Sequence, residues 1–294
     1  MATWIYNTVF GTGPQTVQIV SAGGSSQSAS LLPVDPPPSY EDAASPDSKQ
    51  PLGSGSPLRR HPLELPALTL LRTKRFVLAS ASPRRKELLQ LLNLPDIEIV
   101  PSSFAENLDK SHYTPWEYVL ETATQKCQAV YTSEIARTDV DEPTLVLAAD
   151  TVICLASGEV LEKPKSPAHH MAMLQTLRDA GAHKVYTAVV AMTPLEDATH
   201  PGYAMQNHVE ETIVYFDKTI TDELLLSYVR TREGADKAGG YAIQGTGSIL
   251  IEKIEGSYDN VVGLPVRSTL RLIEKVLSGD DDVEIGEDGE PVVL

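Results

Sequence analysis

The chain has 294 residues, of which 41% are hydrophobic, and it carries a formal net charge of −16 at pH 7. This length and apolar content allow one large folded domain or two small ones. The negative charge argues against nucleic acid or an anionic membrane as a partner, because both bind through basic faces. If the chain binds a polyanion, its few cations must gather in one pocket.

The cysteines and the basic residues indicate the compartment. Cys127 and Cys154 lack metal-ligand spacing, and a chain this long with two cysteines is not a disulfide scaffold, so we expect buried thiols in a reducing compartment. No apolar run reaches the roughly 18 residues of a membrane span. The first basic residue, Lys49, comes too late for a secretory signal or a mitochondrial presequence. We therefore expect a cytoplasmic protein.

Along the chain, composition divides the sequence into three parts. Residues 1–65 are rich in Gly, Ser and Pro and are predicted to be disordered, because they cannot bury enough apolar surface to offset the entropy of ordering. Within them, Pro37–Tyr40 matches the short polyproline motif bound by WW domains, with a chance match in a Pro-rich segment as the alternative. A folded domain is expected over 66–279, followed by a solvated acidic tail over 280–294.

Strands and helices alternate through the folded domain. Strands are predicted at residues 76–79, 97–100, 145–153, 160–161, 185–192, 210–216 and 248–254. Helices are predicted to begin at Ser82, Thr114, Ser166, Thr221 and after Pro265, each at a capping residue or a proline. The first helix is predicted to face the core with Leu88, Leu89, Leu91 and Leu92. Residues 194–208 are expected to form a loop or a hairpin tip, and the whole order indicates an α/β domain with a mixed sheet.

A polar segment from Ser80 to Arg85 lies where the first strand becomes a helix. Helix N-termini present unpaired N–H groups and the positive end of the helix dipole, so they attract phosphate. The hydroxyls of Ser80 and Ser82 and the guanidinium groups of Arg84 and Arg85 strengthen this prediction, because guanidinium binds phosphate in a fork. The alternative is an ordinary helix cap with two surface arginines.

Asp150 follows the most apolar strand, at the position where open α/β sheets place their ligand sites. A carboxylate is costly to bury there unless it holds a metal, a cation or a proton in transit. The alternative is a structural ion pair with a nearby Arg or Lys.

Two further segments carry candidate binding residues. Lys163 follows the predicted hairpin, and residues 236–245 combine Lys237 and Gln244 with glycines that let backbone approach a ligand. The glycine-rich segment lacks phosphate-loop and dinucleotide spacing. His183 is interpreted as a structural hydrogen-bond partner rather than a general base.

In this order, the segments resemble the Maf family of nucleotide pyrophosphatases over residues 75–278. The motifs that carry the resemblance are Leu78–Arg85, Ala149–Val152, Gly158–Pro164, His183–Thr187, Asp236–Gly239, Tyr241–Gly245, Gly256–Tyr258 and Val261–Pro265. The resemblance implies an elongated mixed sheet flanked by helices, with two lobes and a deep cleft, similar to inosine triphosphate pyrophosphatases. It also implies hydrolysis of nucleoside triphosphates between the α- and β-phosphates with a divalent metal, Mg²⁺ or Mn²⁺, and a homodimer.

The resemblance also assigns roles to residues. Asp150 matches the proton acceptor and a metal ligand, and Glu106 matches a second acid that helps to hold metal. The substrate-binding positions are Arg84, Thr151, Gln244, Ser80, Arg85, Lys126, Lys163 and Lys237. The Ile243-Gln244-Gly245 sequence is similar to the branch acting on dTTP and UTP, and a Gln amide can both donate to and accept from a pyrimidine edge.

The sequence leaves three other functions open. One is a nucleotide-binding regulator of cell division that does not hydrolyse, one is an adaptor recruited through Pro37–Tyr40, and one is an inosine triphosphate hydrolase. The segments at 132–143 and 194–208 are expected to be longer than in compact family members and to affect substrate entry.

Overall fold

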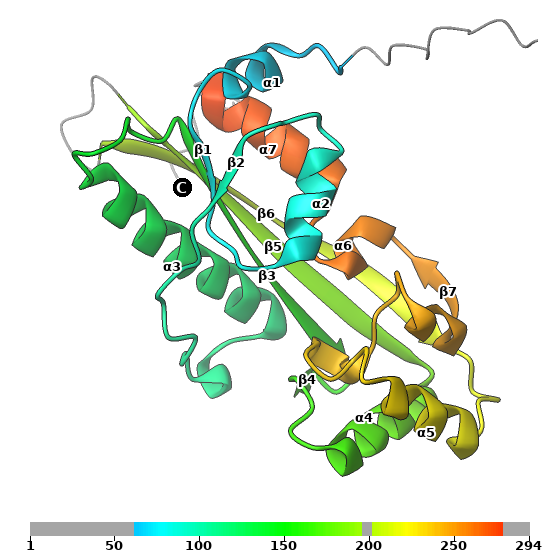
Figure 1. Ribbon diagram of the computed structural model, residues 1–294. Coiled ribbons are helices and arrows are strands. Elements are labelled where there is room, and N and C mark those ends of the chain that lie inside the picture. The colour runs from blue at the N-terminus through cyan, green and yellow to red at the C-terminus, as the bar shows by residue number, and fades with distance from the viewer. Residues whose placement is uncertain (1–61, 196–201, 279–294) are drawn as a thin grey trace, which may run out of the picture. The chain divides into compact units, whose positions relative to one another are not determined.

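The computed structural model describes residues 62–195 and 202–278 (Figure 1). The WW motif, most of the segment predicted to be disordered and the acidic tail lie outside these residues, so those predictions stay predictions. Within the described ranges, no helix is long and apolar enough to cross a bilayer.

A mixed open sheet forms the centre of the domain, which confirms the predicted fold class. Its strands in the described residues are β1 (Phe76–Leu78), β2 (Ile97–Ile99), β3 (Leu145–Leu155), β4 (Val160–Leu161), β5 (Ala182–Pro194), β6 (Tyr203–Phe216) and β7 (Ile251–Glu255). Their order is β2-β1-β3-β5-β6-β7, and β4 pairs with β3 beside this path. The β2-β1-β3 portion is parallel, whereas β3-β5, β5-β6, β6-β7 and β3-β4 are antiparallel.

Helices flank the sheet in the described residues. They are α1 (Pro66–Leu71), α2 (Pro83–Gln90), α3 (Pro115–Ile135), α4 (Pro167–Ala180), α5 (Asp222–Thr231), α6 (Tyr258–Val262) and α7 (Val266–Ser278), with short 3-10 turns η2 (Lys110–His112), η3 (Ala238–Gly240) and η4 (Thr246–Leu250). Three helix starts are confirmed with their caps. Thr114 and Glu117 form a capping box, and the hydroxyls of Ser166 and Thr221 accept backbone N–H bonds.

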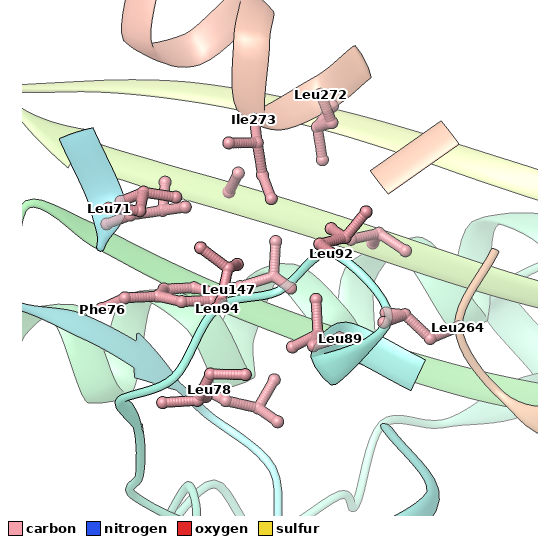
Figure 2. Packing of buried hydrophobic residues seen from close by; sticks show 14 of the residues in the cluster. Leu71, Phe76, Leu78, Leu89, Leu92, Leu94, Leu147, Leu264, Leu272 and Ile273 are labelled. Carbon is pink, nitrogen blue, oxygen red and sulfur yellow. The ribbon is translucent and has the colours of Figure 1, made fainter. Parts of the chain in front are cut away.

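The two faces of the parallel end are covered by different helices. Leu145, Leu147 and Ala149 of β3 pack on one face against α1, α2 and α7, where Phe76, Leu89 and Ile273 join the same cluster (Figure 2). The intervening residues Val146, Ala148 and Val152 pack on the opposite face against α3. This alternation follows from the two-residue period of a strand and decides on which face each polar residue of β3 lies.

The other end of the sheet has its own core. There β3, β5 and β6 continue past β1 and pack against α4 and α5, with Ile153, Val185 and Val214 contacting Leu174 and Leu225 in one cluster. Figure 1 shows these long strands joining the two ends, with α1, α2, α3 and α7 at one end and α4 and α5 at the other. The deep cleft and the likeness to inosine triphosphate pyrophosphatases stay predictions.

Three sequence predictions need correction, and one helix was missed. Leu91 is 67% exposed, because α2 ends at Gln90 and Leu91 no longer follows the helical core face. The predicted loop 194–208 is shorter, since residues from Tyr203 onward pair with β5 in a long hairpin. Residues 248–250 form the end of η4 rather than strand. The α1 helix was missed, although Leu68 and Leu71 are buried in the core.

Candidate active site at the edge of strand β3

The candidate site lies on β3, between the segment that pairs with β1 and the segment that pairs with β4. Strand β1 pairs with β3 only over residues 145–147, and β4 pairs with it over 153–154. Over the intervening residues 148–152, β5 is the one strand in the described part of the sheet that pairs with β3. The parallel order β2-β1-β3 also places a topological switch point here, and open α/β sheets bind ligands outside the carboxyl ends of strands at such points.

Asp150 occupies this gap and is 9% exposed. Its position in β3 is two residues from Ala148, so it lies on the α3 face, where Lys126 of α3 donates to its Oδ1 at 2.7 Å. Burial raises the pKa of Asp150, and the nearby charges of Lys126 and Arg85 oppose this rise. A carboxylate with a raised pKa is a better general base near neutral pH than an ordinary aspartate.

Lys126 connects two carboxylates. Its Nζ lies 2.7 Å from Asp150 and 2.8 Å from Oε1 of Glu106, which is in the irregular segment between β2 and η2. The three residues thus form a chain of ion pairs that runs from the buried Asp150 to the exposed Glu106. The position of Lys126 on the inward face of α3 follows from its helical spacing to Cys127, Ala123 and Val130, which are buried.

Arg85 of α2 enters from the opposite face of β3. Its Nε donates to the carbonyl of Gly263 at 2.9 Å, and its two terminal nitrogens donate to the hydroxyls of Ser80 and Thr151 at 3.1 Å each. Burial lowers the pKa of Arg85, while the negative charge of Asp150 opposes this change.

A chain of hydroxyls supports Thr151. Its Oγ1 lies 2.9 Å from Oγ1 of Thr187 on β5, and Thr187 donates to the carbonyl of Asn260 in α6 at 3.0 Å. Asn260 itself is fully buried and donates to the backbone of Val185 and to Thr212. Sequence analysis gave no role to Thr187 or Asn260, because a polar residue within a strand or a short helix has no distinctive spacing.

The helix start at α2 differs in detail from the prediction. Ser82 is the N-cap residue, but its side chain makes no capping hydrogen bond. Instead, Ser80, which is 7% exposed, accepts from the N–H of Ser82 and from Arg85. The hydroxyl that was predicted to meet phosphate therefore also fixes the arginine beside it.

Other predicted binding residues have freer side chains. Gln244 and Lys163 are exposed, and neither makes a hydrogen bond or ion pair to a described residue. Glu162, next to Lys163, pairs with Lys110 of η2. Arg84 likewise lacks a hydrogen bond in the described ranges.

Within the glycine-rich segment, the charged side chains are paired locally. Lys237 donates to Asp236 at 2.7 Å and to the carbonyl of Glu233 at 2.6 Å. The pKa of Asp236 is lowered, mainly by the hydrogen bond from Lys237 and also by the charge of Arg84, which places Arg84 near this segment.

His183 behaves as a structural residue. Its Nε2 lies 2.7 Å from the hydroxyl of Tyr241, and burial lowers its pKa to about 3. It is therefore neutral at physiological pH and packs edge-to-face on Phe216 and Tyr241. The structure agrees with the interpretation of His183 as a hydrogen-bond partner rather than a general base.

A buried carboxylate that is paired with an ammonium and lies in the field of a nearby guanidinium at a sheet edge suits an α/β enzyme that handles a charged ligand. Sequence comparison gives the family: a model described as Maf-like protein matches residues 75–276, and the chain belongs to this family. The family resemblance found in the motifs is thereby confirmed.

Three curated relatives are similar over most of the folded domain. A dTTP/UTP pyrophosphatase of Schizosaccharomyces pombe is 53% identical over 215 residues, covering 72% of this chain and 88% of the relative. One from Saccharomyces cerevisiae is 38% identical over 205 residues, covering 67% and 88%. One from Bacillus cytotoxicus is 37% identical over 212 residues, covering 70% and 97%.

Proposed function

We propose that this chain hydrolyses nucleoside triphosphates, dTTP and UTP first among them, to the nucleoside monophosphate and pyrophosphate. The observation that carries the proposal is the buried Asp150, which pairs with Lys126 and feels the charge of Arg85, in a chain 53% identical to a relative named dTTP/UTP pyrophosphatase. Fold alone would not support it, because one α/β architecture hosts many chemistries.

In this proposal, Asp150 accepts the proton of the water that attacks the α-phosphorus. Its burial raises its pKa, so the carboxylate accepts a proton more readily than an exposed aspartate, while the charges of Lys126 and Arg85 oppose this rise. The bond from water oxygen to phosphorus forms as the bond to the bridging oxygen breaks, and pyrophosphate leaves.

The cations bind and stabilise the phosphates. Arg85 is already fixed by three acceptors, so it presents a guanidinium in one orientation. Lys126, Arg84 and Lys163 supply further positive charge, and the charge that develops on the phosphates is stabilised by such preplaced groups. Ser80, Thr151 and Lys237 complete the predicted phosphate and substrate contacts.

The residues present fit a divalent ion that arrives with the substrate. Glu106 and Asp150 contact the same ammonium at 2.8 and 2.7 Å, so their oxygens converge on one region. The described residues offer no group of three or more His, Cys, Asp or Glu that could hold a metal. Mg²⁺ is often bound through one or two carboxylates plus phosphate oxygens, and Mn²⁺ accepts the same oxygen donors. When bound, the ion neutralises phosphate charge.

Gln244 selects the base in this proposal. Its amide can donate to and accept from the edge of thymine or uracil, and its side chain is exposed with no described protein partner. Purified full-length protein, supplied with Mg²⁺ or Mn²⁺ and a panel of nucleotides, tests the function. Release of pyrophosphate with dTTP and UTP as the best substrates is expected, and no release from any triphosphate would exclude it.

Three other assignments belong to the same proposal. Cytoplasmic location and a homodimer are expected, and cell fractionation and light scattering test them. Binding of a WW domain through Pro37–Tyr40 is tested by deleting residues 1–65, which should abolish such binding and leave hydrolysis unchanged.

A further inference from the structure

We propose that Glu233 is a positioning residue for base selection: its carboxylate fixes the backbone around Gln244 and so aims that side chain. The inference rests on the proposed function in which Gln244 contacts the base. Glu233 lies just after α5, far from Asp150 in the sequence, and none of the motifs singled out above includes it.

The carboxylate of Glu233 holds the start of η4 with both of its oxygens. Oε1 accepts from the N–H of Thr246 and Oε2 accepts from the N–H of Gly247, each at 2.8 Å. These are the orphan N–H groups of a helical turn, which a carboxylate satisfies with charge-assisted bonds. The backbone that follows Gln244 is therefore tied to the end of α5.

The carboxylate is packed directly against the residue after Gln244. A Cβ added to Gly245 would lie 2.0 Å from Oε1 of Glu233, so a side chain there would displace the carboxylate. The glycine at this position is explained by the close approach of Glu233 and does not depend on a positive φ. Such close approach is one of the main uses of glycine.

The backbone before Gln244 is held from the same place. The hydroxyl of Tyr228 accepts from the N–H of Ala242 at 3.2 Å and also hydrogen-bonds to Glu233. Further back, the imidazole of His170 lies 2.5 Å from the carbonyl of Gly240. Gln244 is thus the exposed point between two anchored backbone positions, and its side chain has no hydrogen bond of its own among the described residues. Its direction is set by its backbone, which Glu233 holds.

The negative charge of Glu233 suits its role as the acceptor of two backbone N–H groups. Burial alone would raise the pKa of Glu233, but the N–H groups of Thr246 and Gly247 outweigh it and the pKa is lowered. The group is therefore an acceptor-only carboxylate at neutral pH, which suits two N–H donors. A glutamine at position 233 would instead place its NH₂ group against one of these two backbone N–H donors.

The test measures kcat and KM of the full-length protein for dTTP and dATP, which share the deoxyribose triphosphate and differ in the base. For Glu233→Ala, we expect the dTTP-to-dATP ratio of kcat/KM to fall roughly tenfold, and roughly threefold for Glu233→Gln, because charge-assisted bonds are lost. The loss should appear in KM for dTTP, with kcat nearly unchanged. Gly245→Ala should also lower the ratio, because the added Cβ would displace the carboxylate of Glu233.

Controls separate this inference from the proposed function. Glu223→Gln, at an exposed carboxylate in the first turn of α5, should leave the ratio unchanged. Gln244→Ala should lower the ratio, and adding Glu233→Ala to it should lower it no further. If Gln244→Ala lowers the ratio but Glu233→Gln and Gly245→Ala do not, the inference is wrong while the proposed function stands. A ratio unmoved by Gln244→Ala, or equal losses for dTTP and dATP in folded Glu233 variants, would overturn the inference. Circular dichroism verifies folding of each variant.

Discussion

The cluster around Asp150 and the glycine-rich segment around Gln244 are built in opposite ways. In the first, side chains hold one another: Asp150 with Lys126, and Arg85 with Ser80 and Thr151. In the second, the backbone is anchored and the candidate side chain Gln244 is left exposed. The comparison suggests that the reacting groups are placed before substrate arrives, whereas the base contact forms only with the nucleotide present.

Asp150→Asn breaks the first region at its centre. The amide keeps the shape but cannot accept a proton from water, so kcat should fall by at least about 10³-fold, within the range of general-base catalysis. The dissociation constant for dTTP, measured by calorimetry without turnover, should change less than about fivefold. Asp96→Asn, at an exposed position, is the matched control. Unchanged turnover in the Asp150 variant would falsify the assignment of the base.

Arg85→Lys tests whether side-chain locking matters beyond charge. Lysine keeps a cation but cannot reach Gly263, Ser80 and Thr151 together, so kcat/KM should fall roughly 10²-fold through misplacement. Arg84→Lys provides the comparison, because Arg84 has no hydrogen bond in the described ranges. It should lose far less, mostly in KM. Equal losses in steady-state assays would show that the two arginines act only as charges.

The same contrast explains what sequence could predict. The strands, the capping box at Thr114 and the hairpin after β3 depend on local patterns, and the structure has them. Asp150 was singled out because a carboxylate in a strongly apolar strand is costly to bury unless it has a function. The start of β6 at Tyr203 was missed, because its pairing is fixed by β5 in the long hairpin and not by alternation in its own residues.

Residues that act through others were harder to find. Thr187 supports Thr151, and Glu233 holds the backbone after Gln244, but each is distant in sequence from its partner. Their roles depend on which chain segments meet in three dimensions, and a single sequence without that contact information does not contain them.

Gln244→Glu sharpens the second half of the comparison. A carboxylate can only accept, so it cannot satisfy both groups of the thymine or uracil edge. The dTTP-to-dATP ratio of kcat/KM should fall roughly tenfold while kcat changes little, because this contact lies away from the reacting atoms. Gln90→Glu, exposed on α2, controls for added negative charge. An identical ranking across the nucleotide panel would remove Gln244 from base selection.

The smallest expected effect is a displacement of the pH profile. Asp150 must be ionised to accept a proton, so kcat/KM should rise as pH increases through its pKa, which burial places above the ordinary aspartate value. The charge of Lys126 opposes the burial-driven rise in the pKa of Asp150, and Lys126→Met removes this charge. The acid limb should therefore move to higher pH, so that activity is lost at pH values where the unmodified protein still works. Lys86→Met, at a half-buried position on α2, should leave the pH profile in place. A limb that stays in place in the Lys126 variant would mean that its ammonium does not set the ionisation of Asp150, and that the pair serves substrate binding alone.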